Sequence, residues 1–193
     1  MNLVERAQKI LLQPQQEWYV IQQEPTQPAE LYTGYIIPLA AIGPVASLIG
    51  HTIFGYGLYA PPIFVVIIGS IILYVLSLGG IYVSALIVDA LAPTFASQKS
   101  INQALKLVAY ASTPGWIAGI LNLVPVLGIL AIIAAFYGIY LFYLGVPVMM
   151  RTPQDKAVPY IVTTAVVCFV IYFIIFAIAG AITASMIWNY RGL

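Results

Sequence analysis

The stretch LVAYASTPGWIAGILNLVPVLGILAIIAAFYGIYLFYLGVPVMM, residues 107–150, decides the fold, because its 44 consecutive residues include no charged side chain. A continuous α-helix of that length would be about 66 Å long, at roughly 1.5 Å per residue. The hydrocarbon core of a bilayer is only about 30 Å thick, so the segment has to fold back inside the membrane. Asn122 and Pro125 are turn-forming residues near its middle, and they predict one span over about 104–123 and another over about 126–150.

Apolar stretches of similar length lie on both sides of this segment. They predict three further spans, over about residues 35–54, 63–91 and 158–188. Charged residues make up 7% of the chain and hydrophobic residues 62%, whereas a soluble domain carries roughly 25% and 45–50%. The sequence therefore predicts an all-α integral membrane protein. We expect a five-transmembrane-helix bundle over 31–193, preceded by a short cytoplasmic amphipathic helical segment over 1–30.

This N-terminal segment is the part expected to meet water. Apolar residues such as Ala7 and Ile10 recur at helical spacing, with Arg6 among the polar residues on the other side. Such a pattern is typical of a short amphipathic helix, which we expect to lie on the membrane surface. Pro14 can open a second short helix. Trp18 in that helix either marks the headgroup level or packs on the underside of the bundle.

The seven basic residues gather in alternate gaps between the predicted spans. Six of them lie on one side: Arg6, Lys9, Lys99, Lys106, Arg151 and Lys156. Only Arg191 lies on the other side. Because positively charged loops stay in the cytoplasm, we expect a cytoplasmic N-terminus and a C-terminus outside.

Asp89 is the one acidic residue inside a predicted span. A carboxylate is costly to place in a membrane, so by default it indicates a functional site, here a polar route for an ion or substrate. The alternative is an ordinary charge near the cytoplasmic end of its span. It would then meet water, pair with Lys106 or Lys99, or cap the helix that begins near Ser100.

Other polar side chains also leave two interpretations open. Glu24 and Glu30, beside the first span, are either solvated or bonded to backbone, or they form a docking or cation site for a cytoplasmic partner. Tyr137, Tyr140 and Tyr143 follow one flank of the fourth span. They either line a wet cavity or pack and hydrogen-bond between helices.

Small residues recur four apart and predict close helix packing, either inside the bundle or across a homodimer seam. These pairs are Gly43 with Ser47, Gly80 with Ser84, Gly115 with Gly119, and Gly180 with Ala184.

Reactive side chains are sparse in this sequence. A nucleophile requires a nearby base, but Cys168 is expected deep in the fifth span and His51 at the outer end of the first, as a surface histidine. No two His, Cys or acidic residues share metal-ligand spacing on a helix. We therefore expect no enzyme, no cofactor and no metal site. The net charge of +1, without a basic arm, argues against a nucleic-acid partner.

Three stretches resemble the Yip-domain family, whose eukaryotic members interact with Ypt and Rab GTPases: ELYTGYIIPLAAI (30–42), LIVDALAPTFASQKSINQALKLVAYASTPGW (86–116) and NLVPVLG (122–128). Eukaryotic members carry an Asp-Leu-Tyr-Gly-Pro signature before the first span. Glu30, Leu31 and Tyr32 match it with Glu in place of Asp, while Thr33 and Gly34 depart from it. These departures argue against Rab binding. The short N-terminal segment implies the bacterial branch, which has no Rab partners.

The resemblance implies a scaffold in the bacterial cytoplasmic membrane. We expect a non-enzymatic multispan protein that interacts with membrane lipids or other membrane proteins, with a homo-oligomer as a further alternative. The candidate interaction or polar-site residues are Glu24, Glu30, Leu31, Tyr32, Gly34, Tyr35, Asp89 and Lys106. The competing interpretation is a small channel, transporter or lipid-moving protein that uses Asp89 and the tyrosine flank of the fourth span.

Overall fold

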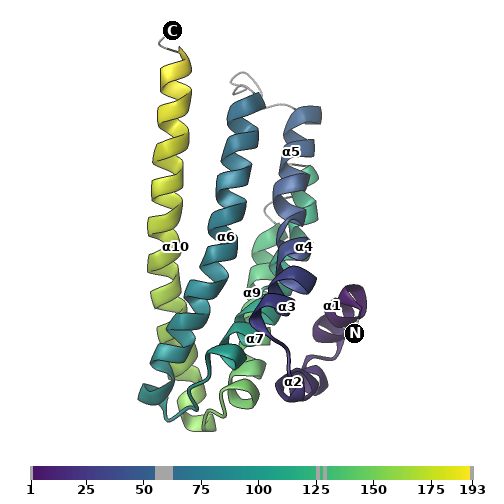
Figure 1. The fold of residues 1–193 in the computed structure, drawn as a ribbon, viewed down its shortest axis with the longest axis vertical. Helices are drawn as coiled ribbons and strands as arrows, with labels where there is room; N and C mark the ends of the chain where they lie inside the picture. Colours follow the sequence, from purple (N-terminus) through teal and green to yellow (C-terminus); the bar gives the residue numbers. More distant parts are fainter. Residues whose placement is uncertain (1, 55–62, 125–126, 128–129, 192–193) are drawn as a thin grey trace.

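The computed structural model describes residues 2–54, 63–124, 127 and 130–191 (Figure 1). Within these residues the chain is helical and contains no strand. Five helical segments are long and apolar enough to cross a membrane: Pro28–Ile53, Ile63–Phe95, Ile101–Leu123, Ala131–Met149 and Gln154–Ile182. The prediction of an all-α membrane protein with five spans is confirmed.

The first span is a series of short helical pieces. It consists of α3 (Pro28–Leu31), a π-helical turn (Tyr32–Ile36), α4 (Ile37–Ala40) and α5 (Ile42–Phe54). Prolines explain these irregularities, because each lacks the N–H that would bond to the carbonyl four residues earlier. Pro38 follows the π-helical turn, and Pro44 follows the break between α4 and α5. The first span is therefore built from pieces that can follow the surface of the bundle.

The second span is a single long helix, α6 (Ile63–Leu91), which ends in a 3₁₀ turn, η3 (Ala92–Phe95). The third span contains α7 (Ile101–Ala111), α8 (Thr113–Ala118) and the 3₁₀ segment η4 (Gly119–Leu123). The fourth and fifth spans are α9 (Ala131–Met149) and α10 (Gln154–Arg191). Pro125, one of the two expected turn residues, lies outside the described residues.

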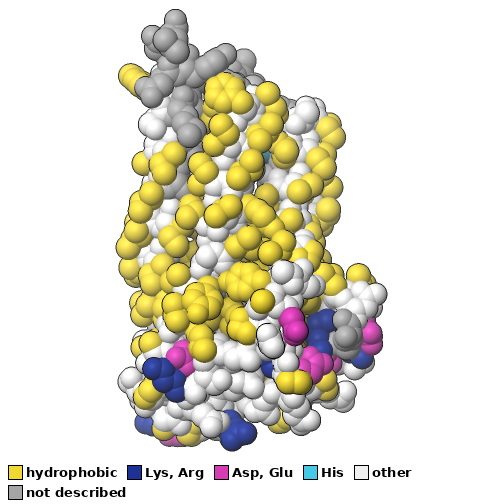
Figure 2. All heavy atoms as spheres, in the orientation of Figure 1, with side chains coloured by type: hydrophobic (Ala, Val, Ile, Leu, Met, Phe, Trp, Pro, Cys, Tyr) yellow, Lys and Arg dark blue, Asp and Glu magenta, His cyan; other side chains and the backbone are white. Residues whose placement is uncertain are grey.

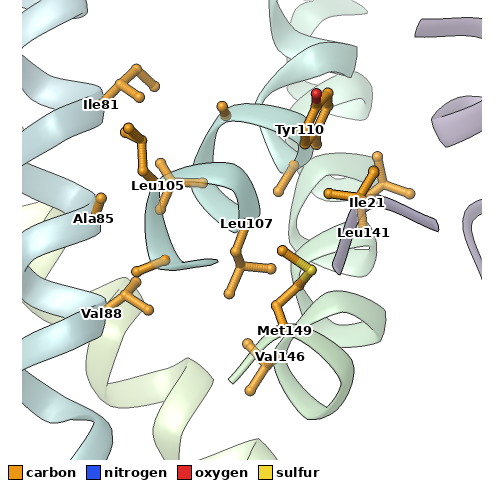
Figure 3. Close-up of a cluster of buried hydrophobic side chains, with 14 of the residues drawn as sticks. Ile21, Ile81, Ala85, Val88, Leu105, Leu107, Tyr110, Leu141, Val146 and Met149 are labelled. Atoms are coloured by element: carbon orange, nitrogen blue, oxygen red, sulfur yellow. The ribbon is translucent and has the colours of Figure 1, made fainter. Parts of the chain in front are cut away.

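The α7 helix is the centre of the bundle. Every residue from 104 to 111 is buried, and α7 contacts both α6 and α9. In Figure 3, Leu105 points toward Ile81 and Ala85 of α6. Leu107 lies between α6 and the α9 residue Val146. The apolar core therefore lies in the half of the bundle that surrounds α7.

The outer surface of the spans is apolar. Phe169 on α10 and Ile133 on α9 are 71% and 67% exposed, respectively. Figure 2 shows hydrophobic side chains over most of the visible face, with Lys, Arg, Asp and Glu gathered toward one end. A surface that is apolar over most of its area is typical of helices that face lipid. We call the charged end, which contains the α6–α7 and α9–α10 links, the basic end (Figure 1).

Small residues allow close backbone contact inside the bundle. The helix α5 lies against η4. A Cβ atom at Gly119 would lie 2.8 Å from the Cα of Gly43, and one at Gly50 would lie 2.5 Å from the backbone oxygens of Asn122 and Leu123. At Gly180 nothing lies within 4 Å of such an atom among the described residues. The pairs that contain Gly43 and Gly119 thus pack internally.

Candidate functional site

Two short helices, α1 (Leu3–Leu12) and α2 (Pro14–Gln23), form an N-terminal cap beside the basic end (Figure 1). The side chain of Asn2 accepts a hydrogen bond from the Val4 N–H at 3.3 Å and so caps α1. Pro14 opens α2, as predicted. Ile10, Trp18 and Ile21 are at most 1% exposed and belong to the same buried cluster as α7 and α9.

The cap is therefore part of the folded bundle. Of the two interpretations of Trp18, packing on the bundle is the one that the structure shows. One face of α1 packs on protein, and its position at the membrane surface stays a prediction. Val4 and Leu12 remain 56% and 78% exposed on its other faces.

Arg6 is the main correction to the sequence-based pattern. It was expected on the polar face of α1, yet it is only 4% exposed. Its guanidinium donates hydrogen bonds to the carboxylates of Glu17 and Glu24 and lies 5.6 Å from the centre of the Tyr110 ring. Burial lowers the pKa of Arg6, but the hydrogen bond to Glu24 and the neighbouring acidic groups outweigh burial and raise the pKa above its usual value. Arg6 thus joins α1, α2 and α7 as a permanent cation.

Lys106 is a second buried cation, 1% exposed. Its ammonium group donates hydrogen bonds to the backbone oxygens of Ile21, at 3.1 Å, and Glu24. These carbonyls belong to the last turn of α2, where a positive charge is favourable. Lys106 therefore fixes the end of α2 and does not pair with Asp89. Glu24 therefore accepts hydrogen bonds from both cations. Its carboxylate accepts from Arg6, and its backbone carbonyl accepts from Lys106.

Asp89 lies near the basic end of α6 and is 9% exposed. Its Oδ2 atom lies 3.9 Å from the Lys99 ammonium, and its Oδ1 atom is buried without a hydrogen-bond partner among the described residues. Ser100 itself caps α7, through a 3.5 Å hydrogen bond from the Gln103 N–H. Of the alternatives weighed for Asp89, the structure shows the pairing with Lys99.

In the segment that leads into the first span, some side chains pack on or bond to the bundle and others are exposed. Leu31 and Tyr35 are buried, and the Tyr35 hydroxyl shares a 2.8 Å hydrogen bond with a threonine hydroxyl of α8. The Tyr32 hydroxyl donates to a backbone oxygen of α6 at 2.9 Å. Glu30 is exposed and accepts a 3.3 Å hydrogen bond from the backbone at the start of α3. Gly34 is exposed, with nothing described within 4 Å of a Cβ placed there.

The three tyrosines of α9 differ in their contacts. Tyr137 donates a 2.6 Å hydrogen bond to the Leu11 carbonyl and so holds α1 against α9. Tyr140 and Tyr143 are 45% and 46% exposed. Tyr137 therefore packs and hydrogen-bonds between helices, as one of the two interpretations has it. The other two rings lie on the surface of α9.

A cavity of about 630 Å³ lies between α5, α6, the α8–η4 segment and α10. Its polar lining residues are Ser47, His51, Ser70, Ser77, Asn122 and Tyr172. Neither Asp89 nor the α9 tyrosines border it. His51, expected as a surface residue, is half-buried and bonds through Nδ1 to the Ser47 carbonyl at 2.6 Å. Sequence reasoning missed this cavity, because its walls come from segments far apart in the chain.

Comparison with known proteins gives a consistent picture. A family model described as the Yip1 domain matches residues 9–187, which include part of the cap and all five spans. The Inner membrane protein YohC of Escherichia coli strain K12 is 23% identical over 185 residues, covering 92% of each chain. The protein of the same name from E. coli O6:H1 matches to the same extent. No solved structure matches the chain.

Proposed function

This chain belongs to the Yip1 domain family, and we propose that it works as a non-enzymatic scaffold that binds other membrane proteins. The five apolar helices and the inner membrane relative support a multi-pass protein of the inner membrane. The contact surface in this proposal is the exposed side of the cap, defined by Val4, Leu12, Tyr19 and Val20. These residues are 56%, 78%, 59% and 46% exposed.

One observation carries the proposal: buried charges hold the cap against the bundle, while Val4, Leu12, Tyr19 and Val20 remain exposed on it. Arg6 and Lys106 tie both short helices to α7 and to each other. A surface that is already ordered loses little conformational entropy when a partner binds. Exposed tyrosine and aliphatic side chains supply contact area of the kind found at binding hot spots and functional patches.

The proposal also fixes the orientation of the chain. The α6–α7 link with Lys99, the α9–α10 link with Arg151 and the first turn of α10 with Lys156 lie at the basic end, as does the cap (Figure 1). The helix α10 ends at Arg191 on the other side. We expect alkaline phosphatase to be active when fused after Leu193 and inactive when fused within the 151–156 link. The opposite pattern would place the cap outside the cell and remove its cytoplasmic partner.

Photo-crosslinking in native membranes tests the contact surface. A photoreactive residue at Leu12 or Tyr19 should form adducts of discrete mass with protein. At Ile133, a lipid-facing control that is 67% exposed, the same residue should give only lipid adducts. Adducts at Leu12 and Tyr19 that also consist of lipid alone would contradict the protein scaffold.

The buried Oδ1 atom of Asp89, which has no hydrogen-bond partner among the described residues, favours a channel or transporter instead. Such a protein would move an ion in proteoliposomes and would lose that flux in Asp89→Asn. The scaffold proposal expects no flux in either protein. Flux that depends on Asp89 would overturn it.

A further inference from the structure

The cavity of about 630 Å³ extends along the bundle inside the membrane-spanning part. All its described lining residues belong to four of the five candidate spans, the first, second, third and fifth. On α6 they run from 65 to 77, a distance of about 18 Å at 1.5 Å per residue. One leaflet accounts for about half of the roughly 30 Å hydrocarbon core. The cavity therefore has the depth of a single leaflet, and its volume lies within the usual range of ligand sites, about 300–1,000 Å³.

Polar side chains lie toward both ends of the cavity. His51 lies near the end of α5 that points away from the cap, and Asn122 is level with it, since Gly50 touches the Asn122 backbone. At the other end the Tyr172 ring packs against Gly80, and its hydroxyl accepts a hydrogen bond from Ser84 at 3.2 Å. Both ends thus hold polar side chains. The inner end has Tyr172, and the outer half has Asn122, whose amide nitrogen is directed toward Gly43, and His51, whose Nδ1 atom is bonded to the Ser47 carbonyl.

The walls between these ends are largely apolar. They include Leu73, Leu76, Trp116 and Ile175, and no Asp, Glu, Lys or Arg is among the described lining residues. Three serines, Ser47, Ser70 and Ser77, interrupt these walls, and the Ser77 hydroxyl is already bonded to the Tyr74 carbonyl. An anionic headgroup would find no cation here. A hydrocarbon chain fits these largely apolar walls, with any neutral polar group that it carries at the end nearer the bilayer surface.

From this geometry we infer that the cavity is a binding site for a membrane glycerolipid, with one acyl chain along the apolar walls. The ester and glycerol region lies at the outer end, at the level of His51, where the cavity approaches the surface of the bilayer. The occupant enters sideways from the bilayer between the helices. This inference does not depend on the scaffold proposal, because the cap and the cavity lie on different parts of the chain.

A matched pair of variants on α6 tests the site. Ser70 is half-buried at the cavity, whereas its neighbour Ile71 is 57% exposed toward lipid. The probe is a phosphatidylethanolamine with a photoreactive group in one acyl chain, present in trace amounts in phosphatidylethanolamine vesicles that contain the purified full chain. Crosslinks in the parent should map to lining residues of α5, α6 and η4. They should fall roughly tenfold in Ser70→Phe, equivalent to about 1.4 kcal/mol, and persist in Ile71→Phe.

A second variant covers the case in which Ser70→Phe fails to fold. Asn122→Leu removes the polar group at the outer end and should also reduce the crosslinks. Excess unlabelled phospholipid should compete with the probe, and free fatty acid should not. Equal labelling of Ser70→Phe and Ile71→Phe, competition by fatty acid alone, or unchanged labelling of folded Asn122→Leu would each overturn the assignment. None of these results would bear on crosslinks at Leu12 or Tyr19.

Discussion

Replacement of Arg6 by alanine is expected to release the N-terminal cap from the bundle. The change would leave the Glu17 carboxylate, whose residue is 5% exposed, without its cation. Breaking a buried ion pair by removing one partner costs about 3–5 kcal/mol, because the remaining charge is buried and uncompensated. We expect the cap to unfold at a lower temperature in detergent and to be cleaved rapidly by protease, while the spans stay folded.

Two further variants separate the buried charge from other effects of this substitution. Lys9→Ala is the matched control, since the pair of Lys9 with Glu5, at 2.8 Å, lies on the surface of α1. It should leave proteolysis of the cap unchanged. Arg6→Leu combined with Glu17→Leu removes both buried charges and should recover much of the lost stability. A double variant as labile as Arg6→Ala would contradict the ion-pair explanation.

Trp18→Ala should have an effect of similar size through packing. Trp18 is fully buried, and its ring meets Tyr110 edge-on at 6.4 Å between centroids. A Cβ atom at Gly145 would lie 2.8 Å from the ring, so the indole fills a slot on α9 closely. Truncating a buried tryptophan to alanine costs about 3–5 kcal/mol. The thermal midpoint in detergent should fall accordingly.

The adjacent tyrosine provides the control for this prediction. Tyr19 is 59% exposed, so Tyr19→Ala should leave the midpoint nearly unchanged. If both substitutions lower the midpoint equally, α2 does not pack in the orientation described.

The fold class followed from the sequence because lipid imposes length and polarity on every span. The uncharged segment 107–150 could not cross the bilayer once, and the structure indeed divides it between α7–η4 and α9. The second short helix was also predictable, because Pro14 favours a helix start. Each of these conclusions depends on local sequence alone.

The candidate site was harder to predict because its charges are neutralised by partners distant in the sequence. Helical periodicity places Arg6 among polar neighbours, and it gives no sign that Glu17 approaches from another helix. Lys106 carried a usable signal, a lone cation beside an apolar run, but its partners are backbone carbonyls of α2. Such carbonyls leave no mark in a sequence pattern. The cavity near His51 and Asn122 was not predictable either, because its lining residues come from segments distant in the sequence.

Hydrogen exchange of the full chain in phosphatidylethanolamine nanodiscs tests most directly whether the cap is a fixed surface. The amides of α1 and α2 should be protected and should exchange together with those of α7, because Trp18 and Lys106 join these helices. The protection of α1 and α2 should be lost in Arg6→Ala while α6 remains protected. Exchange of the cap in the parent protein at the rate of an unfolded peptide, with the spans still protected, would contradict the account.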